Sequence, residues 1–407
     1  MARRMACVLA PALALSLYAS GNATSPAAAA AGQRPVVTWA ASADRLGEAV
    51  SDRSYRLVVH TSGGGRGLRI RVSNAFGDRP LTLGAAYAGV QSNGALLVPG
   101  SNRKLAFSGS RSVTLAAGES RYSDPLPGSV KAQSNLVISL YAQIAGGQAT
   151  GHGMALQTSY TASGDHAAEE TDDAYTERIA SWLYLDAVTV GAAPGTGAVA
   201  TLGDSITDGW QSTTDKNRRW PDYLAGRLHA APGGSIQGVA NEGISGNKVL
   251  MDGAGQSAVG RLQRDVLSQA GVRTVLLFEG INDIKAHDGV TAAGLIAGYR
   301  EIIGRAHAAG KCVVGATVLP YKGWSEWTPA EEAVRRDVNA FVRTGGEFDA
   351  VADFDRVLRS PYDSERMLPT FDGGDHLHPN DKGMQAMADS VDLSALACER
   401  GGTPPYS

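Results

Sequence analysis

Apolar and polar residues alternate in short runs through the first half of the chain. In LRIRVSN, Leu68, Ile70 and Val72 lie on one face of an extended segment and Arg69 and Arg71 on the other, and LVISLY repeats this period further on. Turn-forming stretches such as SNAFGDRP, PGSN and AAGES separate the runs. Alternation with a period of two, interrupted by turns, is typical of half-buried strands. We therefore expect an antiparallel β-sandwich-like accessory domain over residues 33–190.

The pattern changes after residues 191–197, whose sequence GAAPGTG predicts a flexible linker. Segments beyond it space their apolar residues with the period of a helix, as at Val259, Leu262 and Val266. Alternation of strand and helix predicts an α/β catalytic domain over 198–400, with a parallel sheet and helices on both faces. The expected strands are the five apolar runs at 198–203, 236–240, 273–278, 312–318 and 349–354.

Composition and charge narrow the class of protein. The 407 residues are 43% hydrophobic and 19% charged, so the chain is globular and long enough for more than one domain. Its 37 Lys and Arg residues nearly balance its 40 Asp and Glu residues, which gives a net charge of −3. This balance argues against a nucleic-acid partner.

The N-terminus has the order of a secretory signal. Arg3 and Arg4 precede an apolar stretch from Ala6 to Tyr18, and small residues follow, so we expect a signal peptide over residues 1–32. The stretch is too short to span a bilayer, and a weak membrane anchor is the alternative. Cleavage removes the two arginines and changes the net charge from −3 to −5. We expect a secreted protein, extracellular or periplasmic, without stable membrane insertion.

The cysteines bear on the same compartment. Cys7 leaves with the signal, and Cys312 and Cys398 remain. In an exported protein such a pair forms a disulfide or stays as two buried thiols. Both positions are expected at the same edge of the sheet, which leaves the two alternatives open.

Polar residues gather where the parallel strands are expected to end. The first run ends in Gly203-Asp204-Ser205, the second in NEGISGN, the third in EGINDI, and a loop after the fifth reads DGGDHLHPN. Because ligands of such sheets bind beyond the carboxyl ends of the strands, these segments are expected to meet. A hydroxyl, glycine-rich backbone, a carboxamide and Asp-x-x-His together are what acyl transfer requires.

Each member of this set has an expected role. Ser205 is the nucleophile, His378 takes its proton, and Asp375 orients the imidazole and raises its pKa. Asp372 and His376 are the competing acid and base within the same loop, and the Asp-x-x-His spacing favours Asp375 and His378. Asp204 is expected to brace the turn as a hydrogen-bond acceptor.

Negative charge on the tetrahedral intermediate needs hydrogen-bond donors. We expect the backbone N–H groups of Ser205 and Gly243 and the side-chain amide of Asn282 to form this oxyanion hole, because glycine lets the backbone approach closely. Taken alone, Asn282 and Asp283 are equally compatible with capping a helix. No Cys/His cluster has metal-ligand spacing, so no metal and no cofactor are expected.

The segments GDSITDG, NEGISGN, GIND and DHLHP resemble, in this order, the four sequence blocks of the GDSL/SGNH hydrolase family. The resemblance covers about residues 198–395 and implies a three-layer α/β/α fold. It also implies a triad of Ser205, Asp375 and His378, with Gly243 and Asn282 in the oxyanion hole. Thr207 stands where the second glycine of G-x-S-x-G would be, which argues against an ordinary α/β-hydrolase elbow.

The resemblance implies a secreted carboxylic ester hydrolase, and a similar domain pairing occurs in bacterial esterases of plant polysaccharides or simple acyl esters. We expect short-chain acyl or acetyl groups on carbohydrate as substrates. The alternatives are a lipase or arylesterase, and a carbohydrate-binding protein with an inactive hydrolase domain. His152 is expected in a loop. Three tryptophans are interpreted as a substrate wall or as core: Trp210, Trp324 and Trp327.

Overall fold

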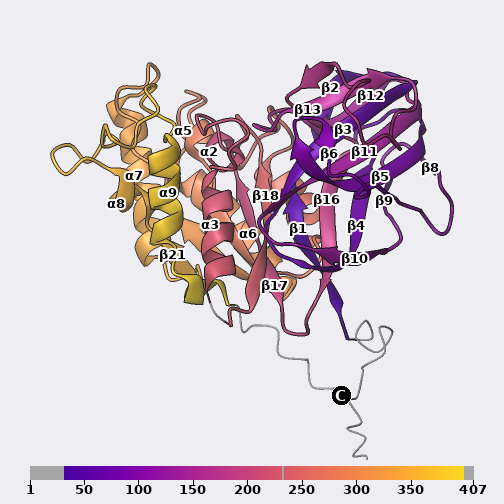
Figure 1. Ribbon diagram of the computed structural model, residues 1–407. Helices are drawn as coiled ribbons and strands as arrows, with labels where there is room; N and C mark the ends of the chain where they lie inside the picture. Colours follow the sequence, from indigo (N-terminus) through magenta and orange to yellow (C-terminus); the bar gives the residue numbers. More distant parts are fainter. Residues whose placement is uncertain (1–31, 232, 398–407) are drawn as a thin grey trace, which may run out of the picture.

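The computed structural model describes residues 32–231 and 233–397. Within them, the chain forms a β-rich N-terminal half and a layered α/β half that lie side by side (Figure 1). The predicted signal peptide falls almost entirely on residues 1–31, outside the described part. In the part that is described, no helix combines the length and apolar character that a bilayer crossing requires.

The N-terminal half is built of antiparallel strands, as the alternating pattern predicted. One sheet comprises β1 (Arg34–Ala40), β16 (Leu185–Ala192), β4 (Gly65–Ser73), β10 (Leu126–Val130) and β9 (Ser120–Tyr122). A second comprises β14 (Glu177–Ile179), β13 (Ser159–Ser163), β3 (Arg53–Thr61), β11 (Ser134–Ile144), β5 (Leu81–Asn93), β6 (Leu96–Leu97), β7 (Arg103–Lys104) and β8 (Val113–Leu115). A small third sheet comprises β15 (Trp182–Leu183), β12 (Gln148–His152) and β2 (Asp44–Glu48).

Strand β4 shows why these sequences form such sheets. Leu68, Ile70 and Val72 are buried in the core between the sheets, whereas Arg69 is exposed. Side chains alternate between the two faces of a strand, so a period-two pattern places every apolar residue of β4 on the inner face.

The C-terminal half contains the predicted five-stranded parallel sheet. The strand order is β18 (Ile236–Gly243), β17 (Gly197–Gly203), β19 (Val272–Phe278), β20 (Cys312–Ala316) and β21 (Ala350–Ala352). Every residue of β17 is buried, because a central parallel strand is covered on both faces. Cys312 is disulfide-bonded; Cys398, the partner that the sequence suggests, lies outside the described residues.

Helices cover both faces of this sheet, which gives the expected three layers (Figure 1). One apolar core packs the sheet against α3, α8 and α9, and the other packs it against α4, α6 and α7. The helices are α2 (Ser205–Asp208), α3 (Trp220–Ala230), α4 (Ala258–Arg261), the π-helix η1 (Leu262–Leu267), α5 (Ile281–Ile284), α6 (Ala292–Ala308), α7 (Pro329–Thr344), α8 (Phe354–Leu358), α9 (Asp381–Ser390) and the 3₁₀ helix η2 (Leu393–Leu396).

The two halves share a core. Val36, Val37 and Ala187, from β1 and β16, belong to the same buried cluster as the sheet residues of the C-terminal half. The Val37 N–H donates to the Ala270 carbonyl oxygen at 2.8 Å. The N-terminal half therefore completes one face of the α/β half.

The segment predicted as a flexible linker, 191–197, is mostly structured. Gly191 and Ala192 end β16 and Gly197 begins β17, which leaves only residues 193–196 as a turn. The Thr196 N–H closes that turn on the Ala193 carbonyl oxygen at 3.0 Å. The connection between the two halves is therefore only the four residues 193–196.

Candidate active site

Ser205 begins α2 directly after β17 ends. The Asp204 carboxylate caps this helix by accepting the Ile206 N–H at 2.9 Å, which is the bracing role predicted for it. A Cβ atom on Gly203 would lie 2.1 Å from Thr207 Oγ1 and 2.5 Å from the Phe278 carbonyl oxygen. Only glycine fits this position, so the tight turn that presents Ser205 depends on it.

A continuous chain of hydrogen bonds joins Ser205, His378 and Asp375. The Ser205 Oγ atom lies 2.8 Å from His378 Nε2, and His378 Nδ1 lies 2.7 Å from Asp375 Oδ2. The other oxygen, Asp375 Oδ1, accepts the backbone N–H groups of His378 and Leu377 at 2.8 and 3.0 Å. The side chain of Asp375 is thus fixed by its own loop and holds the imidazole with Nε2 toward the hydroxyl.

The competing residues of this loop form a separate pair. His376 Nδ1 lies 2.6 Å from Asp372 Oδ2, and half of the His376 side chain is exposed. His376 has a positive φ of 66°, and its side chain pairs with Asp372 rather than with Ser205. The structure therefore places Asp375 and His378, and not Asp372 and His376, at Ser205.

The pKa of His378 lies below its ordinary value, although Asp375 raises it as the sequence predicted. Burial lowers the pKa most, the hydrogen bond and charge of Asp375 raise it, and the nearby Lys285 ammonium lowers it again. The sequence pointed to Asp375 but gave no measure of how far the ring is buried. His378 is consequently neutral near pH 7 and able to accept a proton.

Two of the expected oxyanion donors are suitably placed. Ser205 is the first residue of α2, so its N–H has no partner within the helix. Asn282 is buried, and its Nδ2 atom donates one hydrogen bond to the Asn247 carbonyl oxygen at 2.9 Å. An amide has two N–H groups, so the second remains for a substrate oxygen. The helix-cap alternative does not apply to Asn282, since α5 is preceded by Gly280.

Gly243, the third expected donor, is placed differently. Its N–H donates to Asn241 Oδ1 at 3.0 Å, and the residue belongs to β18. The prediction of Gly243 in the oxyanion hole is therefore not supported by the geometry. Gly246, three residues further along the same segment, has a positive φ of 81° and donates its N–H to no described residue. Glycine suits that left-handed conformation, so the left-handed turn is a signal that separates Gly246 from Gly243.

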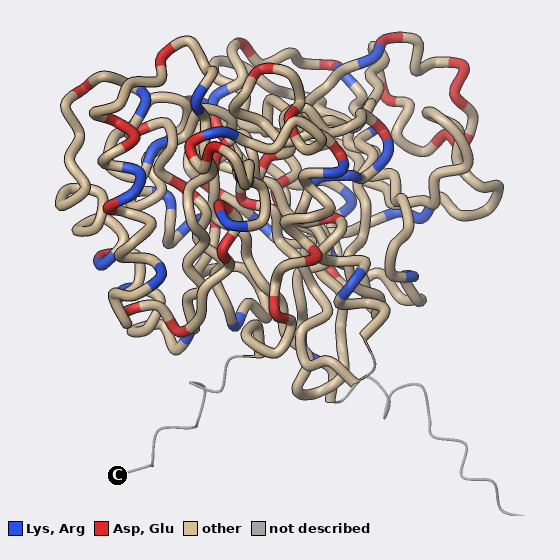
Figure 2. Tube along the Cα trace, turned by 90° about the vertical axis from the view of Figure 1, so that its left-hand side faces the viewer, with Lys and Arg blue, Asp and Glu red and all other residues tan. Residues whose placement is uncertain are grey.

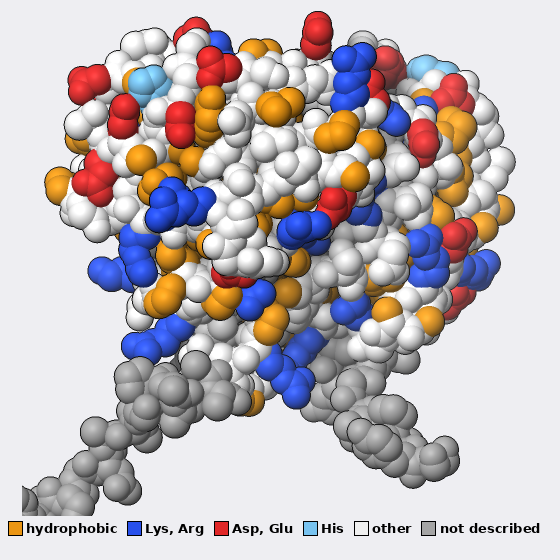
Figure 3. All heavy atoms as spheres, turned by 90° about the vertical axis from the view of Figure 1, so that its right-hand side faces the viewer, with side chains coloured by type: hydrophobic (Ala, Val, Ile, Leu, Met, Phe, Trp, Pro, Cys, Tyr) orange, Lys and Arg blue, Asp and Glu red, His pale blue; other side chains and the backbone are white. Residues whose placement is uncertain are grey.

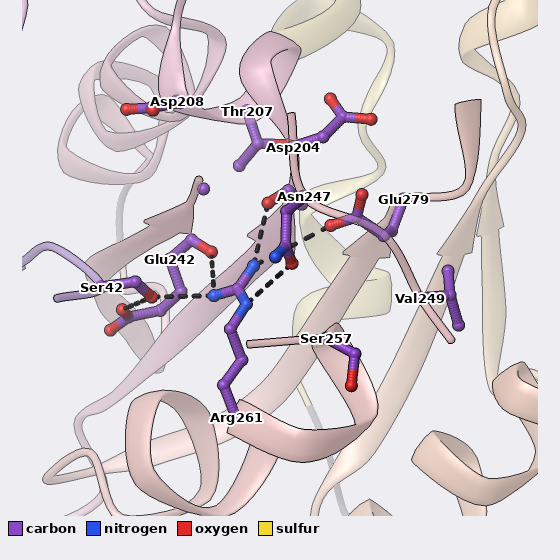
Figure 4. Close-up of polar contacts among 12 residues, drawn as sticks. Ser42, Asp204, Thr207, Asp208, Glu242, Asn247, Val249, Ser257, Arg261 and Glu279 are labelled. Carbon is purple, nitrogen blue, oxygen red and sulfur yellow. Dashed lines mark hydrogen bonds and ion pairs between the residues drawn. The ribbon is translucent and has the colours of Figure 1, made fainter. Parts of the chain in front are cut away.

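The turn that contains Gly246 is held from below by a buried arginine. Arg261 donates hydrogen bonds to Asn247 Oδ1 at 2.9 Å, to the Glu242 carbonyl oxygen at 2.7 Å and to the Gly203 carbonyl oxygen at 3.0 Å. Arg261 donates a fourth hydrogen bond to Ser42 Oγ, at 2.8 Å, and Ser42 belongs to the N-terminal half. Figure 4 shows the guanidinium between these groups. Arg261 thus ties the ends of β17 and β18 to the turn.

Three acidic residues drawn together with Arg261 in Figure 4 are buried: Asp204, Glu242 and Glu279. Burial raises the pKa of Asp204 to about 7 and that of Glu242 to about 8, and it raises the pKa of Glu279 well above its ordinary value. Burial also raises the pKa of Asp283, which accepts the N–H groups of Val249 and Leu250 at 2.8 and 3.2 Å and braces the segment after the turn.

Two of the three candidate wall tryptophans flank His378. The ring centroids of Trp210 and Trp324 lie 6.3 and 6.2 Å from that of His378, both edge to face. Trp210 is 45% exposed. Trp324 is only partly exposed and lies under the Lys285 ammonium, 5.4 Å from its ring centroid. Trp327 packs against the core, and the Lys322 ammonium lies over its ring.

His152 was expected in a loop and is instead the last residue of β12, almost fully buried. Its Nε2 atom lies 2.9 Å from Asp208 Oδ1 at the end of α2. Sequence reasoning missed this residue because its partner lies 56 positions away and in the other half of the chain.

Comparison with known proteins identifies a family domain in the C-terminal half. The model of the GDSL-like lipase/acylhydrolase family matches residues 201–386, whereas a comparison with curated proteins by sequence finds no match. Among solved structures, the chain is similar to an acetyl xylan esterase from Geobacillus stearothermophilus, with 22% identity over 50% of this chain and 98% of that chain and a TM-score of 0.38.

Two further solved structures match a similar share of the chain. A carbohydrate acetylesterase from Sinorhizobium meliloti is 16% identical over 47% of this chain and 95% of its own, with a TM-score of 0.39. The aryl esterase of M. smegmatis is 15% identical over the same shares, with a TM-score of 0.40. The family model, rather than these distant likenesses, carries the assignment: residues 201–386 form a GDSL-like lipase/acylhydrolase domain.

Proposed function

We propose that this protein is a secreted serine esterase that removes short acyl or acetyl groups from carbohydrate through an acyl-enzyme on Ser205. The observation that carries the proposal is the chain of hydrogen bonds from Ser205 Oγ through His378 to Asp375. A serine hydroxyl is a weak nucleophile, and a neutral imidazole at 2.8 Å is placed to remove its proton as it attacks.

The reaction follows the usual two halves of acyl transfer. Ser205 Oγ attacks the ester carbonyl carbon while its proton moves to His378 Nε2, and Asp375 stabilises the imidazolium that forms. His378 then gives the proton to the departing alcohol oxygen, which leaves the acyl group on Ser205. Water enters, loses a proton to His378, and releases the acid as Ser205 Oγ regains its proton.

The oxyanion of each tetrahedral intermediate needs preorganised donors. The Ser205 N–H, the Gly246 N–H and the second N–H of Asn282 supply them in this proposal. The turn at Gly246 is held by Arg261 and by the hydrogen bond between Asn282 and Asn247, so little reorganisation accompanies charge development.

The surroundings of His378 favour a carbohydrate ester. Trp210 offers a half-exposed indole beside the imidazole, a surface on which a sugar ring stacks. Lys and Arg are interspersed with Asp and Glu in the trace (Figure 2), and in Figure 3, which faces the N-terminal half, charges of both signs are scattered among uncharged side chains. Such a surface suits a neutral substrate better than a polyanion.

A lipase-like or arylesterase activity is the second candidate. Leu250 and Met251 are 38% and 47% exposed, and they follow the turn that contains Gly246. Because Asp283 holds the Leu250 N–H next to Asn282, this apolar pair borders the oxyanion side of the site. It would accommodate a longer acyl chain or an aryl group.

Secretion is part of the same proposal and rests on residues 1–32. Expression in a bacterial host that exports through the general secretory route tests it. Recovery outside the cytoplasm of a chain that begins near Gln33, identified by mass spectrometry, supports secretion. A cytoplasmic chain that keeps Arg3 and Arg4 contradicts it.

The esterase activity is tested with the purified mature protein on p-nitrophenyl acetate, on a series of esters up to palmitate, and on acetylated xylan. We expect the fastest hydrolysis with acetyl, and an organophosphonate label on Ser205. S205A, which removes one hydroxyl from a small, largely buried side chain and leaves the apolar cores intact, should be inactive and fold normally. An inert wild-type protein without label on Ser205, but with glycan binding, would instead support an inactive hydrolase domain.

A further inference from the structure

A buried ion pair connects the N-terminal half to the helix that carries Ser205. His152 ends β12, and Asp208 ends α2. The side chains are 6% and 4% exposed, and His152 Nε2 lies 2.9 Å from Asp208 Oδ1. Family membership covers residues 201–386 only, so His152 lies outside the part of the chain that the family describes.

The contacts of the imidazole require a proton on both nitrogens. Nδ1 faces the Ser42 carbonyl oxygen at 2.9 Å, and Nε2 faces both Asp208 Oδ1 and the Met154 carbonyl oxygen, at 2.9 and 3.1 Å. Carbonyl oxygens only accept hydrogen bonds, so each nitrogen must donate. Although burial lowers the pKa of His152, the charge and hydrogen bond of Asp208 outweigh it and raise the pKa to about 9. His152 is therefore a cation at neutral pH.

Asp208 transmits this contact to the oxyanion turn. Its second oxygen, Oδ2, accepts the Ser245 N–H at 3.0 Å. Ser245 directly precedes Gly246, and Asn247, directly after it, is held by Arg261 and Asn282. The Gly246 N–H is thus fixed from both sides, and Asp208 supplies one of the two sides.

We propose that His152 is a positioning residue for ester hydrolysis: it holds the Asp208 carboxylate in the orientation that fixes Ser245 and so directs the Gly246 N–H to the oxyanion. This inference rests on the proposed function and extends it, because it gives the N-terminal half a part in the chemistry. Without His152, Asp208 becomes a buried carboxylate with no counter-charge, which is costly enough to make it reorient or take up a proton. The anchor of Ser245 is then lost.

The test compares three variants of the full mature chain on p-nitrophenyl acetate. H152A should lower kcat about 10- to 100-fold with KM within about twofold, less than the roughly 10²- to 10³-fold cost of losing a whole oxyanion donor. H60Q is the matched control, because His60 also reaches across the two halves, to Asn217, but lies outside the oxyanion turn. H60Q should keep kcat within about twofold of wild type, which is small beside the loss of an oxyanion donor.

The double variant H152A/D208N separates positioning from simple packing. The carboxamide that D208N introduces is neutral and keeps an oxygen for the Ser245 N–H, so no unpaired charge remains. We expect the double variant to recover at least about fivefold of the kcat lost in H152A, a coupling that two independent packing defects would not show. If H152A does not give a cooperative thermal melt, H152Q, which can still donate one hydrogen bond, takes its place in the same cycle.

Deuterium uptake of the peptide that contains Ser245 and Gly246 provides a readout without catalysis. The positioning role is supported if deuterium uptake is faster in H152A, unchanged in H60Q and slowed again in H152A/D208N. This result would hold even if the wild-type protein hydrolyses no ester, and that failure would reject only the proposed function. The inference would be overturned by any of three results in H152A: deuterium uptake and kcat equal to those of wild type, a change in KM alone, or a loss of kcat that D208N does not relieve.

Discussion

Two histidines of this molecule are buried, and each is paired with an aspartate, yet their pKa values are shifted in opposite directions. The pKa of His378 is lowered, whereas that of His152 is raised to about 9. The distances from ring nitrogen to carboxylate oxygen, 2.7 and 2.9 Å, are nearly the same. The neighbouring aspartate alone therefore does not decide the charge of the ring.

The difference lies at the other nitrogen. His378 Nε2 faces the Ser205 hydroxyl, which donates as readily as it accepts, so a neutral ring satisfies both partners. Lys285 adds a positive charge nearby. Around His152, each of the three hydrogen-bond partners is an acceptor, so only the cation satisfies them all. The first arrangement suits a base and the second a fixed structural cation.

Removing the carboxylate from the catalytic pair should have the largest effect. D375N leaves the ring of His378 without the acceptor that fixes Nδ1–H, and kcat on p-nitrophenyl acetate should fall by about 10⁴-fold, as for the corresponding change in serine proteases. D372N is the matched control in the same loop, because Asp372 binds His376 and not His378. Its kcat should stay within about threefold of wild type, since the orientation of His378 is unchanged. The reverse ranking would assign the orienting role to Asp372, and two small losses would indicate a Ser–His dyad.

The cationic pair should make stability depend on pH. The folded-state pKa of His152 is about 9, above the ordinary 6.5 of the unfolded chain, so its contribution is complete below pH 6.5 and is lost as pH rises toward 9. The loss is on the order of 3 kcal/mol. Urea unfolding at pH 6 and pH 9 should show a larger drop in the free energy of unfolding for wild type than for H152Q. Parallel drops in both proteins would mean that His152 is not the titrating group.

The catalytic pair should appear in the pH dependence of activity. His378 must be neutral to accept the Ser205 proton, so kcat/KM should rise with pH through an apparent pKa below the ordinary histidine value of 6.5. The profile should be measured from pH 4.5 to pH 8 on a substrate without titratable groups. An acid limb above 6.5 would show that Asp375 outweighs burial after all.

The smallest expected effect concerns Lys285, which contributes least to the shift at His378. K285M removes a positive charge that disfavours the imidazolium, so the acid limb of kcat/KM should move to higher pH. K131M, which changes a lysine of the N-terminal half between β10 and β11, is the control and should leave the limb in place. A shift to lower pH in K285M would contradict the electrostatic account.

Much of the molecule could be predicted from local pattern. Ser205, Asn282, Asp375 and His378 each follow a strand or sit in a short motif, and the strand-end rule brings such segments together without any knowledge of side-chain contacts. The alternating and continuous apolar runs likewise determine the two fold classes, because the period of a strand or helix is a property of a few adjacent residues.

The rest depended on contacts that no local pattern records. Gly243 and Gly246 stand three residues apart in one segment, and two features of the fold distinguish them: the hydrogen bond from the Gly243 N–H to Asn241 and the positive φ of Gly246. The charge of His152 depends on the nearby Met154 carbonyl oxygen and on acceptors from two distant segments, at Ser42 and Asp208. The pKa of His378 depends on the depth of its burial, which the sequence does not state.

The ends of the described chain lie near the amino-terminal ends of the parallel strands, whereas Ser205 follows the carboxyl end of β17 (Figure 1). Arg34 pairs with Ala192 just before β17 begins, and the Leu396 carbonyl oxygen accepts a hydrogen bond from Thr274 near the start of β19. A tether attached to either end would leave the strand ends that carry Ser205 facing outward. Immobilised on a bead or displayed on a cell wall by its termini, the enzyme would keep its reactive edge open to an insoluble polymer.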